Sequence, residues 1–288
     1  MTRSRALDLL LQNLQLERLD RDLFLGQPGP GTGRLFGGHV AAQSVMAAGL
    51  TLEPGAGFIH SLHAYFLKGG THDVPIRFVV DRIRDGRTFS TRHVVAYQGG
   101  EAIFDLSASF ARPEDGVAHQ DVMPGAPPPD GLPDWEDVRG EILEDAERRR
   151  RSQPIEIRVV DPDLPGERLP ARRRIWMRPN GELPDDPLIH AAVLTYASDR
   201  TLLSTAARPH GLTWGRRMSA SLDHAVWFHG PVTFNDWVLY ASESPVARHA
   251  RGLIFGSIWT PGGLRIASVA QEGLIRIPRD RVEDAPGR

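Results

Sequence analysis

Three polar side chains interrupt apolar stretches in the second half of the sequence. Asp199 lies within the apolar stretch Leu188–Leu203, Ser221 begins a second apolar stretch, and Gln271 interrupts a third. An ionised carboxylate is costly to bury unless it is hydrogen-bonded, so Asp199 requires partners or a functional role. Its carboxylate could accept a proton, and the hydroxyl of Ser221 and the amide of Gln271 could orient a reacting group.

Purely structural roles would explain these residues as well. Asp199 could cap a helix end, or it could pair with Arg200 or Arg208. Ser221 and Gln271 could face solvent, because successive side chains of a strand point to opposite faces. Residue type alone leaves both interpretations open.

Other motifs give no sign of a metal ion, a nucleotide or a serine nucleophile. Gly29, Gly31 and Gly33 alternate with prolines and follow no predicted strand, so we interpret them as a turn. His60 and His63 are three residues apart on a predicted strand and point to opposite faces. The sequence also lacks the His-Glu-x-x-His and Gly-x-Ser-x-Gly motifs. We therefore expect no cofactor and no metal.

The composition excludes several classes of function. The 288 residues include 34 basic and 36 acidic side chains, which gives a net charge of −2 and argues against nucleic-acid binding. Cysteine is absent, which excludes disulfides, thiolate zinc sites and a cysteine nucleophile. Residues 1–22 read as an amphipathic helix and not as a signal peptide, and no run of 18 apolar residues occurs. We expect a cytoplasmic protein with no membrane span.

Two halves of the sequence show the same order of predicted elements. The first half has a helix at Phe36–Leu50 and strands at Ser61–Leu67, Ile76–Arg84, Thr88–Tyr97 and Ala102–Phe110. The second half has a helix at Leu188–Ala206 and strands at Ser221–Phe228, Trp237–Glu243, Ala250–Trp259 and Leu264–Arg276. Extra strands at Ile155–Val160 and Arg172–Arg178 precede the second helix. Alternating apolar residues and Gly-containing turns favour antiparallel hairpins in both halves.

A linker separates the halves. Residues 113–153 begin with a proline-rich stretch, which excludes regular structure, and continue with the charged stretch Glu136–Arg151, which we interpret as a solvated helix. We therefore expect an α+β fold with an N-terminal domain at 1–112 and a C-terminal domain at 154–288. Each domain would pack a long helix on an antiparallel β-sheet.

An ordered set of motifs along the chain resembles the acyl-CoA thioesterase II family, whose members have two fused hotdog domains. The matching blocks are Leu35–Gly38, His60–Leu67, Arg84–Ser90, Tyr196–Asp199, Asp223–His229 and Val269–Gly273. The resemblance implies two fused hotdog domains here. It also implies an enzyme that hydrolyses fatty acyl-CoA to free fatty acid and coenzyme A, as part of fatty acid and lipid metabolism.

The same resemblance implies a catalytic triad of Asp199, Ser221 and Gln271 in the second domain. Family members commonly have Thr in place of Ser221 and Gln in place of His39. Serine keeps the hydroxyl but loses the methyl group that restricts χ1, so Ser221 should be held less rigidly. The acyl chain would occupy an apolar tunnel between helix and sheet, and we expect a homo-oligomer because the sheet edges need cover.

Direct attack by water is the mechanism we expect from these three side chains. Asp199 would accept the proton of a water that Ser221 and Gln271 help to orient. Two alternatives stay open. A hotdog enoyl-CoA hydratase would use Asp223 with His224 or His229, and a non-catalytic acyl-CoA binding protein would keep the pocket alone.

Overall fold

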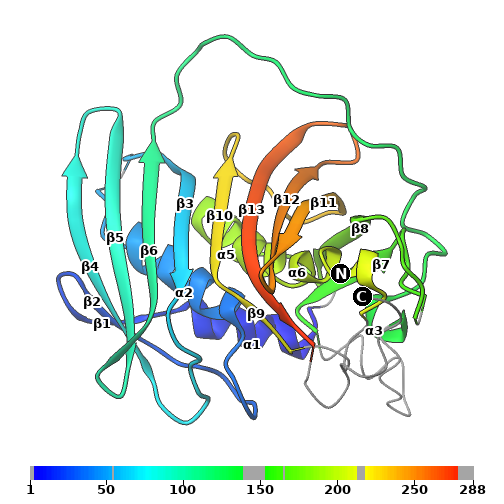
Figure 1. The fold of residues 1–288 in the computed structure, drawn as a ribbon. Helices are drawn as coiled ribbons and strands as arrows, with labels where there is room; N and C mark the ends of the chain where they lie inside the picture. The colour runs from blue at the N-terminus through cyan, green and yellow to red at the C-terminus, as the bar shows by residue number, and fades with distance from the viewer. Residues whose placement is uncertain (1–2, 54, 139–152, 165, 213–217, 278–288) are drawn as a thin grey trace.

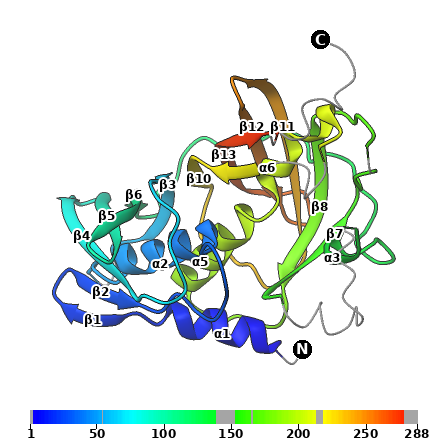
Figure 2. The same cartoon turned by 60° about the horizontal axis from the view of Figure 1, so that its bottom comes forward.

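One antiparallel sheet runs across the whole molecule and carries two central helices on one face. The computed structural model describes residues 3–53, 55–138, 153–164, 166–212 and 218–277. Within these residues, thirteen strands form a single sheet, and helices α2 and α5 lie side by side beneath it (Figures 1 and 2). These helices and the sheet enclose the core of the molecule.

The elements follow one another along the chain as follows. The first half contains α1 Arg5–Leu14, β1 Glu17–Asp20, β2 Leu23–Gly26, α2 Gly37–Gly49, β3 Phe58–Phe66, β4 Ile76–Asp85, β5 Phe89–Gln98 and β6 Glu101–Ala111. The second half contains α3 Trp135–Val138, β7 Ile155–Val159, β8 Arg172–Pro179, α5 Pro187–Ser198, α6 Leu202–Thr205, β9 Met218–Ser221, β10 Asp223–Phe228, β11 Val238–Arg248, β12 Arg251–Trp259 and β13 Arg265–Arg276.

The two halves repeat the same strand order outward from their junction. It is β3-β6-β5-β4-β2-β1 on one side and β10-β13-β12-β11-β8-β7 on the other. Strands β7 and β8, which were expected as extra strands before the second helix, are thus counterparts of β1 and β2. The sequence analysis did not predict β1 and β2. Residues 1–22 were expected to form one helix, but α1 ends at Leu14 and the short β1–β2 pair follows it.

The junction is an antiparallel pairing of β3 with β10. Ala225 lies opposite His63, and Val226 lies opposite Leu62. Leu62 and Val226 are fully buried against the helices, whereas Tyr65 on the outer face is 60% exposed. Strand alternation therefore places one apolar core under both halves, and the buried side chains of the two halves form one cluster.

Close contact between α2 and α5 depends on glycine. A Cβ added at Gly38 would lie 2.8 Å from the backbone oxygen of Tyr196. Most of α2 is buried, including Ala41, Ala42 and Val45, because the sheet covers one side and α5 the other. A largely apolar helix is typical of this enclosed position.

Two expected elements are interrupted at the residues of chemical interest. The helix expected over Leu188–Ala206 divides into α5 and α6, and Asp199 is the residue that caps the C-terminus of α5. The strand expected over Ser221–Phe228 divides into β9 and β10, so Ser221 ends a strand instead of beginning one. Leu222 lies between them, and its carbonyl accepts a hydrogen bond from the backbone of Phe66 in the other half.

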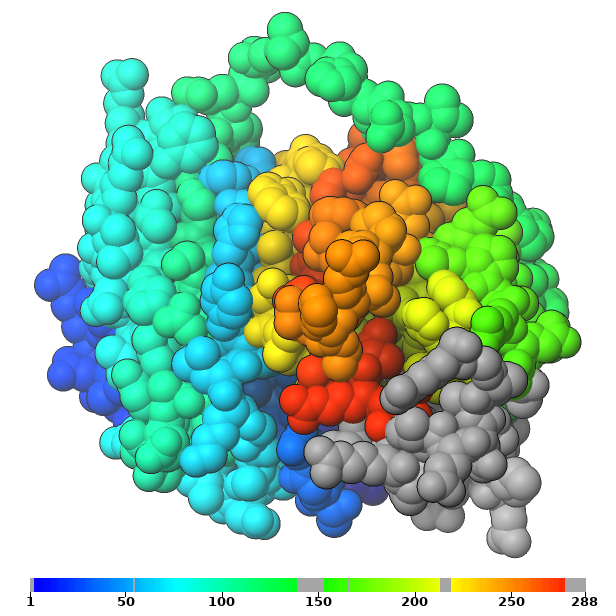
Figure 3. Space-filling model, viewed as in Figure 1, coloured from blue at the N-terminus to red at the C-terminus, as the bar shows by residue number. Residues whose placement is uncertain are grey.

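The described first part of the linker, residues 113–138, crosses the outer face of the second half. After β6 the chain forms an extended arch that stands away from the body, with an opening beneath it (Figure 3). Further along, Met123, Ala126 and Leu132 pack against a small apolar cluster of Trp176, Leu239 and Trp259. The proline-rich part lacks helix and strand as predicted, whereas most of the charged helix expected at Glu136–Arg151 lies outside the described residues.

Candidate active site

A cavity of about 450 Å³ lies where the two halves meet. Its lining from the first half is largely apolar and includes Leu35, Phe36, Val40, Phe66, Ile103 and Phe104. Its lining from the second half includes Asp199, Arg200, Ser204, Ser219 and Ser221. The cavity therefore combines an apolar wall with a group of polar side chains.

The structure brings Asp199, Ser221 and Gln271 into direct contact. The Ser221 hydroxyl donates to Oδ1 of Asp199 at 3.2 Å, and Nε2 of Gln271 donates to the same oxygen at 3.1 Å. Nε2 of Gln271 also donates to Oγ of Ser221 at 2.5 Å. Three side chains that are up to 72 residues apart in the sequence thus form one hydrogen-bonded cluster.

The two oxygens of the Asp199 carboxylate have different surroundings. Oδ1 accepts both donors, whereas no hydrogen bond among the described residues uses Oδ2. Asp199 also lines the cavity.

The local structure explains why Asp199 needs its two donors. Asp199 is 8% exposed and lies at the C-terminus of α5, where the helix dipole disfavours negative charge. The arginines proposed as its partners are engaged elsewhere: Arg200 with Glu136 at 2.5 Å and Arg208 with Asp163 at 2.7 Å. Among the described residues, Ser221 and Gln271 are therefore the groups that hydrogen-bond to the carboxylate.

The N-terminus of α2 borders the same cavity. Gly37 begins the helix, and the N-cap residue Phe36 makes no side-chain capping bond to it. The first backbone N–H groups of a helix lack intrahelical partners and carry partial positive charge. The ring of Phe66 lies next to Gly37, since a Cβ added at Gly37 would lie 2.4 Å from the ring.

Of the two central helices, α5 has a carboxylate residue at its C-terminus and α2 does not. The residue that caps the C-terminus of α2 is Leu50, where α5 has Asp199. The two halves therefore share an architecture but differ in chemistry.

His224 is a buried polar residue next to the cluster whose position the sequence analysis did not predict. Its Nδ1 lies 2.9 Å from Oε1 of Gln271, and its Nε2 lies 2.8 Å from Oγ of Ser198. Burial lowers the pKa of His224, although the nearby charge of Asp199 opposes this effect. A histidine on the inward-facing side of an apolar strand was the signal that could have identified it.

The pair expected for a hydratase is not formed. Asp223 and His224 point to opposite faces of β10, and Oδ1 of Asp223 accepts the backbone N–H of Glu272 at 2.6 Å. His229 contacts Ser268 at 2.7 Å and lies apart from Asp223. The described geometry therefore does not favour the hydratase alternative.

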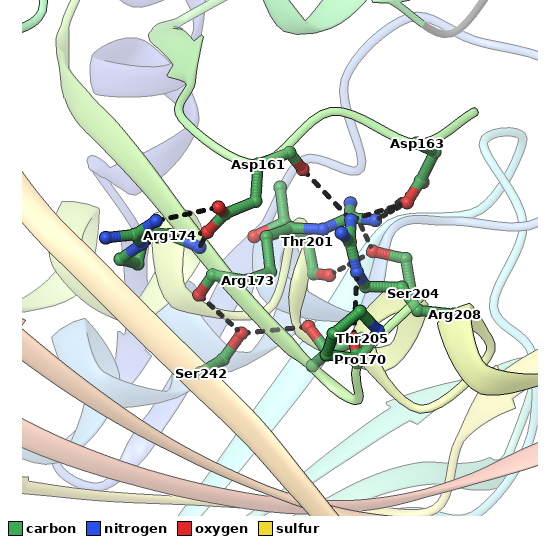
Figure 4. Close-up of polar contacts among 10 residues, drawn as sticks. All are labelled: Asp161, Asp163, Pro170, Arg173, Arg174, Thr201, Ser204, Thr205, Arg208 and Ser242. Atoms are coloured by element: carbon green, nitrogen blue, oxygen red, sulfur yellow. Dashed lines mark hydrogen bonds and ion pairs between the residues drawn. The ribbon is translucent and has the colours of Figure 1, made fainter. Parts of the chain in front are cut away.

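A cluster of ionic and polar side chains includes Ser204 and Thr205 of α6 (Figure 4). Arg173 is 2% exposed, pairs with Asp163 at 2.5 Å and donates to Oγ of Ser204 at 2.9 Å. Arg208 contacts the same carboxylate, and Thr205 contacts Ser242 at 2.8 Å. The cluster thereby fixes one wall of the cavity, because Ser204 belongs to that wall.

A larger cavity of about 690 Å³ lies between the linker and the outer face of the second half, and none of the three clustered residues lines it. Several of its arginines are paired, including Arg174 with Asp161 at 2.8 Å and Arg265 with Asp121 at 3.1 Å. We interpret these pairs as contacts that tether the linker and the loop after β7.

Comparison with known proteins decides the family. Residues 143–274 match the family model for acyl-CoA thioesterase, and residues 27–111 match the model for the acyl-CoA thioesterase N-terminal domain. The crystal structure of acyl-CoA thioesterase II TesB2 from Mycobacterium marinum is 39% identical to this chain, with a TM-score of 0.78 and coverage of 94% of this chain and 98% of the other. The chain belongs to the acyl-CoA thioesterase II family.

Other relatives agree with this assignment. Acyl-coenzyme A thioesterase 8 from Mus musculus is 37% identical to this thioesterase, over 93% of this chain and 89% of its own. A protein from Alicyclobacillus acidocaldarius, described as having a hot dog fold, is 19% identical, covers 93% of this chain and 98% of its own, and has a TM-score of 0.77. The protein is thus a thioester hydrolase with a hotdog fold.

None of the helices among the described residues of this thioesterase has the length and hydropathy that a membrane span requires. No group of three or more His, Asp or Glu side chains in these residues could hold a metal ion.

Proposed function

We propose that this thioesterase hydrolyses fatty acyl-CoA to free fatty acid and coenzyme A by direct attack of a water positioned by Asp199, Ser221 and Gln271. The observation that carries the proposal is the different hydrogen bonding of the two oxygens of the Asp199 carboxylate. Oδ1 accepts both protein donors, whereas Oδ2 accepts no hydrogen bond from the described residues, and Asp199 lines the cavity. An ionised carboxylate with one free oxygen is suited to hold a water and accept its proton.

The reaction balances with these groups alone. Oδ2 of Asp199 takes a proton as the water oxygen bonds to the thioester carbonyl carbon, which gives a tetrahedral oxyanion. Collapse of the oxyanion breaks the carbon–sulfur bond, and the proton held by Asp199 passes to the departing thiolate. Holding water and thioester in reactive geometry can supply up to roughly 7–11 kcal/mol of the lowering of the barrier.

The N-terminus of α2 is the group we assign to stabilise the oxyanion. Gly37 lines the cavity that also contains Asp199, and the helix start has no side-chain cap. Backbone N–H groups at such an end attract negative charge, and one oxyanion donor is typically worth about 3–4 kcal/mol. In this proposal the first half supplies the oxyanion site and the second half supplies the base.

The acyl chain would lie against the apolar wall of the first half. Leu35, Val40 and Phe104 are buried and line the cavity. Arg34 and Lys68, which are exposed, line the same cavity and could contact the phosphates of coenzyme A. The substrate would therefore contact both halves.

We propose that residues 1–112 and 154–288 are two fused hotdog domains joined by the linker 113–153, because both halves repeat one strand order around a central helix. A homo-oligomer in the cytoplasm remains our expectation.

The experiment that tests the function uses the absence of cysteine. A thiol-reactive dye added to the purified protein reports only the coenzyme A released from substrate. Release would be followed with saturated acyl-CoAs of increasing chain length, and the absorbance of an enoyl-CoA would be followed in parallel. Asp199→Asn should reduce release at least 100-fold, which corresponds to about 2.7 kcal/mol.

A matched control is available at the other end of the same helix. Asp186 caps the N-terminus of α5 by accepting the N–H of Leu188, and asparagine caps equally well. Asp186→Asn should therefore release coenzyme A at the wild-type rate. Release that survives in Asp199→Asn would exclude the proposed base. Loss of enoyl absorbance without thiol release would indicate a hydratase, and binding without any turnover would indicate a binding protein.

A further inference from the structure

We infer that His224 is a positioning residue that fixes the amide orientation of Gln271 and thereby the geometry of the Asp199 carboxylate. The inference rests on the proposed function, because it assigns a role within the same site. His224 makes no described hydrogen bond to Asp199 or Ser221, and its ring contacts Gln271, which does bond to both.

The hydrogen bonds of the Gln271 amide determine which ring nitrogen of His224 carries a proton. Nε2 of Gln271 donates one proton to Asp199 and the other to Ser221. The other amide atom, Oε1, can only accept, so the ring nitrogen 2.9 Å away must donate. Nδ1 of His224 therefore carries a proton.

The other side of the ring follows from this assignment. Burial lowers the pKa of His224 and favours the neutral ring, which leaves Nε2 without a proton. The Ser198 hydroxyl, 2.8 Å away, then donates to Nε2. The same hydroxyl lies 3.0 Å from the carbonyl of Thr195, but its single proton serves one acceptor at a time.

His224 also contacts α5, the helix that ends at the proposed base Asp199. Ser198 precedes Asp199 in the sequence, and its carbonyl accepts the hydroxyl of Tyr240 at 3.1 Å. Ser198, His224 and Gln271 are all fully buried, so water does not compete for these hydrogen bonds. One closed set of contacts thus links the end of α5 to β10 and β13.

Loss of the His224 ring would allow the side-chain amide of Gln271 to rotate. Oε1 would then be buried without a donor, and rotation of the amide would turn this oxygen toward the carboxylate of Asp199. The rotated amide would withdraw a donor from Oδ1 and repel it. We expect the chemical step to suffer more than substrate binding, because the cavity wall that holds the acyl chain is unchanged.

The test compares two substitutions of the same residue. His224→Leu keeps an apolar side chain of moderate size and removes the donor, and it should lower kcat by about tenfold to hundredfold with little change in KM. His224→Asn places a side-chain N–H group near the position of Nδ1 and should recover most of the lost kcat. His190→Leu is the matched control, since His190 is equally buried on α5 but contacts the backbone of Phe234 instead.

A second measurement does not depend on turnover. Nitrogen-15 NMR of the histidine rings in the wild-type protein should show His224 neutral with its proton on Nδ1. A proton on Nε2 and none on Nδ1 would overturn the inference, as would a folded His224→Leu with wild-type kcat or an asparagine variant no better than leucine. If the wild type released no coenzyme A, the proposed function would fail, while the ring measurement would still test this arrangement.

Discussion

The Ser221 hydroxyl donates to Oδ1 of Asp199 across 3.2 Å, from the last residue of β9 to the residue that caps α5. Neither residue lies in the middle of a regular element. The break at Leu222 separates β9 from β10, and the break after Ser198 separates α5 from α6. The contact therefore depends on two interruptions that place short polar side chains face to face.

Replacing Ser221 separates the role of its hydroxyl from that of its shape. Ser221→Ala removes one of two donors to Asp199 and should lower kcat by about tenfold, less than Asp199→Asn. Ser221→Thr keeps the hydroxyl and restricts χ1, so its kcat should equal or exceed that of the wild type. Steady-state release of coenzyme A measures both, and a threonine variant slower than the alanine variant would contradict this reasoning.

Gly37 should tolerate no side chain. A methyl group there would lie 2.4 Å from Cε1 of Phe66, so Gly37→Ala must displace the ring or the helix start. A displacement near the reacting atoms can cost up to about 100-fold in kcat/KM. Gly37→Ala combined with Phe66→Leu should recover part of this loss. Gly230→Ala is the control, since nothing lies within 4 Å of its added Cβ.

The depth of the acyl pocket should respond to Val40. This residue lies one turn after Gly37 on α2, is 5% exposed and lines the cavity. Val40→Phe would fill part of the apolar space, so kcat/KM should fall for long acyl-CoAs and stay near the wild-type value for short ones. The short substrates serve as an internal control for correct folding. An equal loss at every chain length would show that the residue does not limit pocket depth.

His39 should make stability depend on pH. Burial lowers the pKa of His39 in the folded protein, the charge of His72 lowers it further, and a hydrogen bond to Gln27 opposes both. Above about pH 7.5 the ring is neutral in folded and unfolded chains, so it contributes nothing to the pH dependence. As the pH falls through about 6.5, the unfolded chain binds a proton that the folded chain does not, and stability decreases.

His39→Gln should remove that contribution and keep a donor for the carbonyl of Gln27. Urea unfolding at pH 8 should give similar free energies of unfolding for the two proteins. At pH 5.5 the variant should gain about 1 kcal/mol relative to the wild type. An unchanged difference between the two pH values would show that His39 titrates normally in the folded protein.

Much of the fold followed from local pattern. The alternating apolar residues of β4, β5 and β6 and the Gly-containing turns between them predicted hairpins that the structure contains. The repeat was also visible, because each half must bury one helix and one sheet face by the same pattern. The β1–β2 pair escaped prediction, since Glu17–Asp20 is exposed throughout and lacks alternation.

The sequence by itself determined the residue types and the order of the elements. Asp199 in an apolar stretch, Ser221 and Gln271 were visible as anomalies, because burial of a charge or an amide is costly without partners. The family resemblance grouped the three residues as one site. Periodicity alone was equally consistent with solvent-facing positions.

Only the tertiary structure decided how these residues meet. The pairing of β3 with β10 joins the halves and brings the N-terminus of α2 to the cavity of Asp199. His224 lies on the inward-facing side of β10, and Asp223 lies on the other face. These relationships involve residues far apart in the chain. The free energy that fixes them comes from burying one shared core, and no local sequence pattern records it.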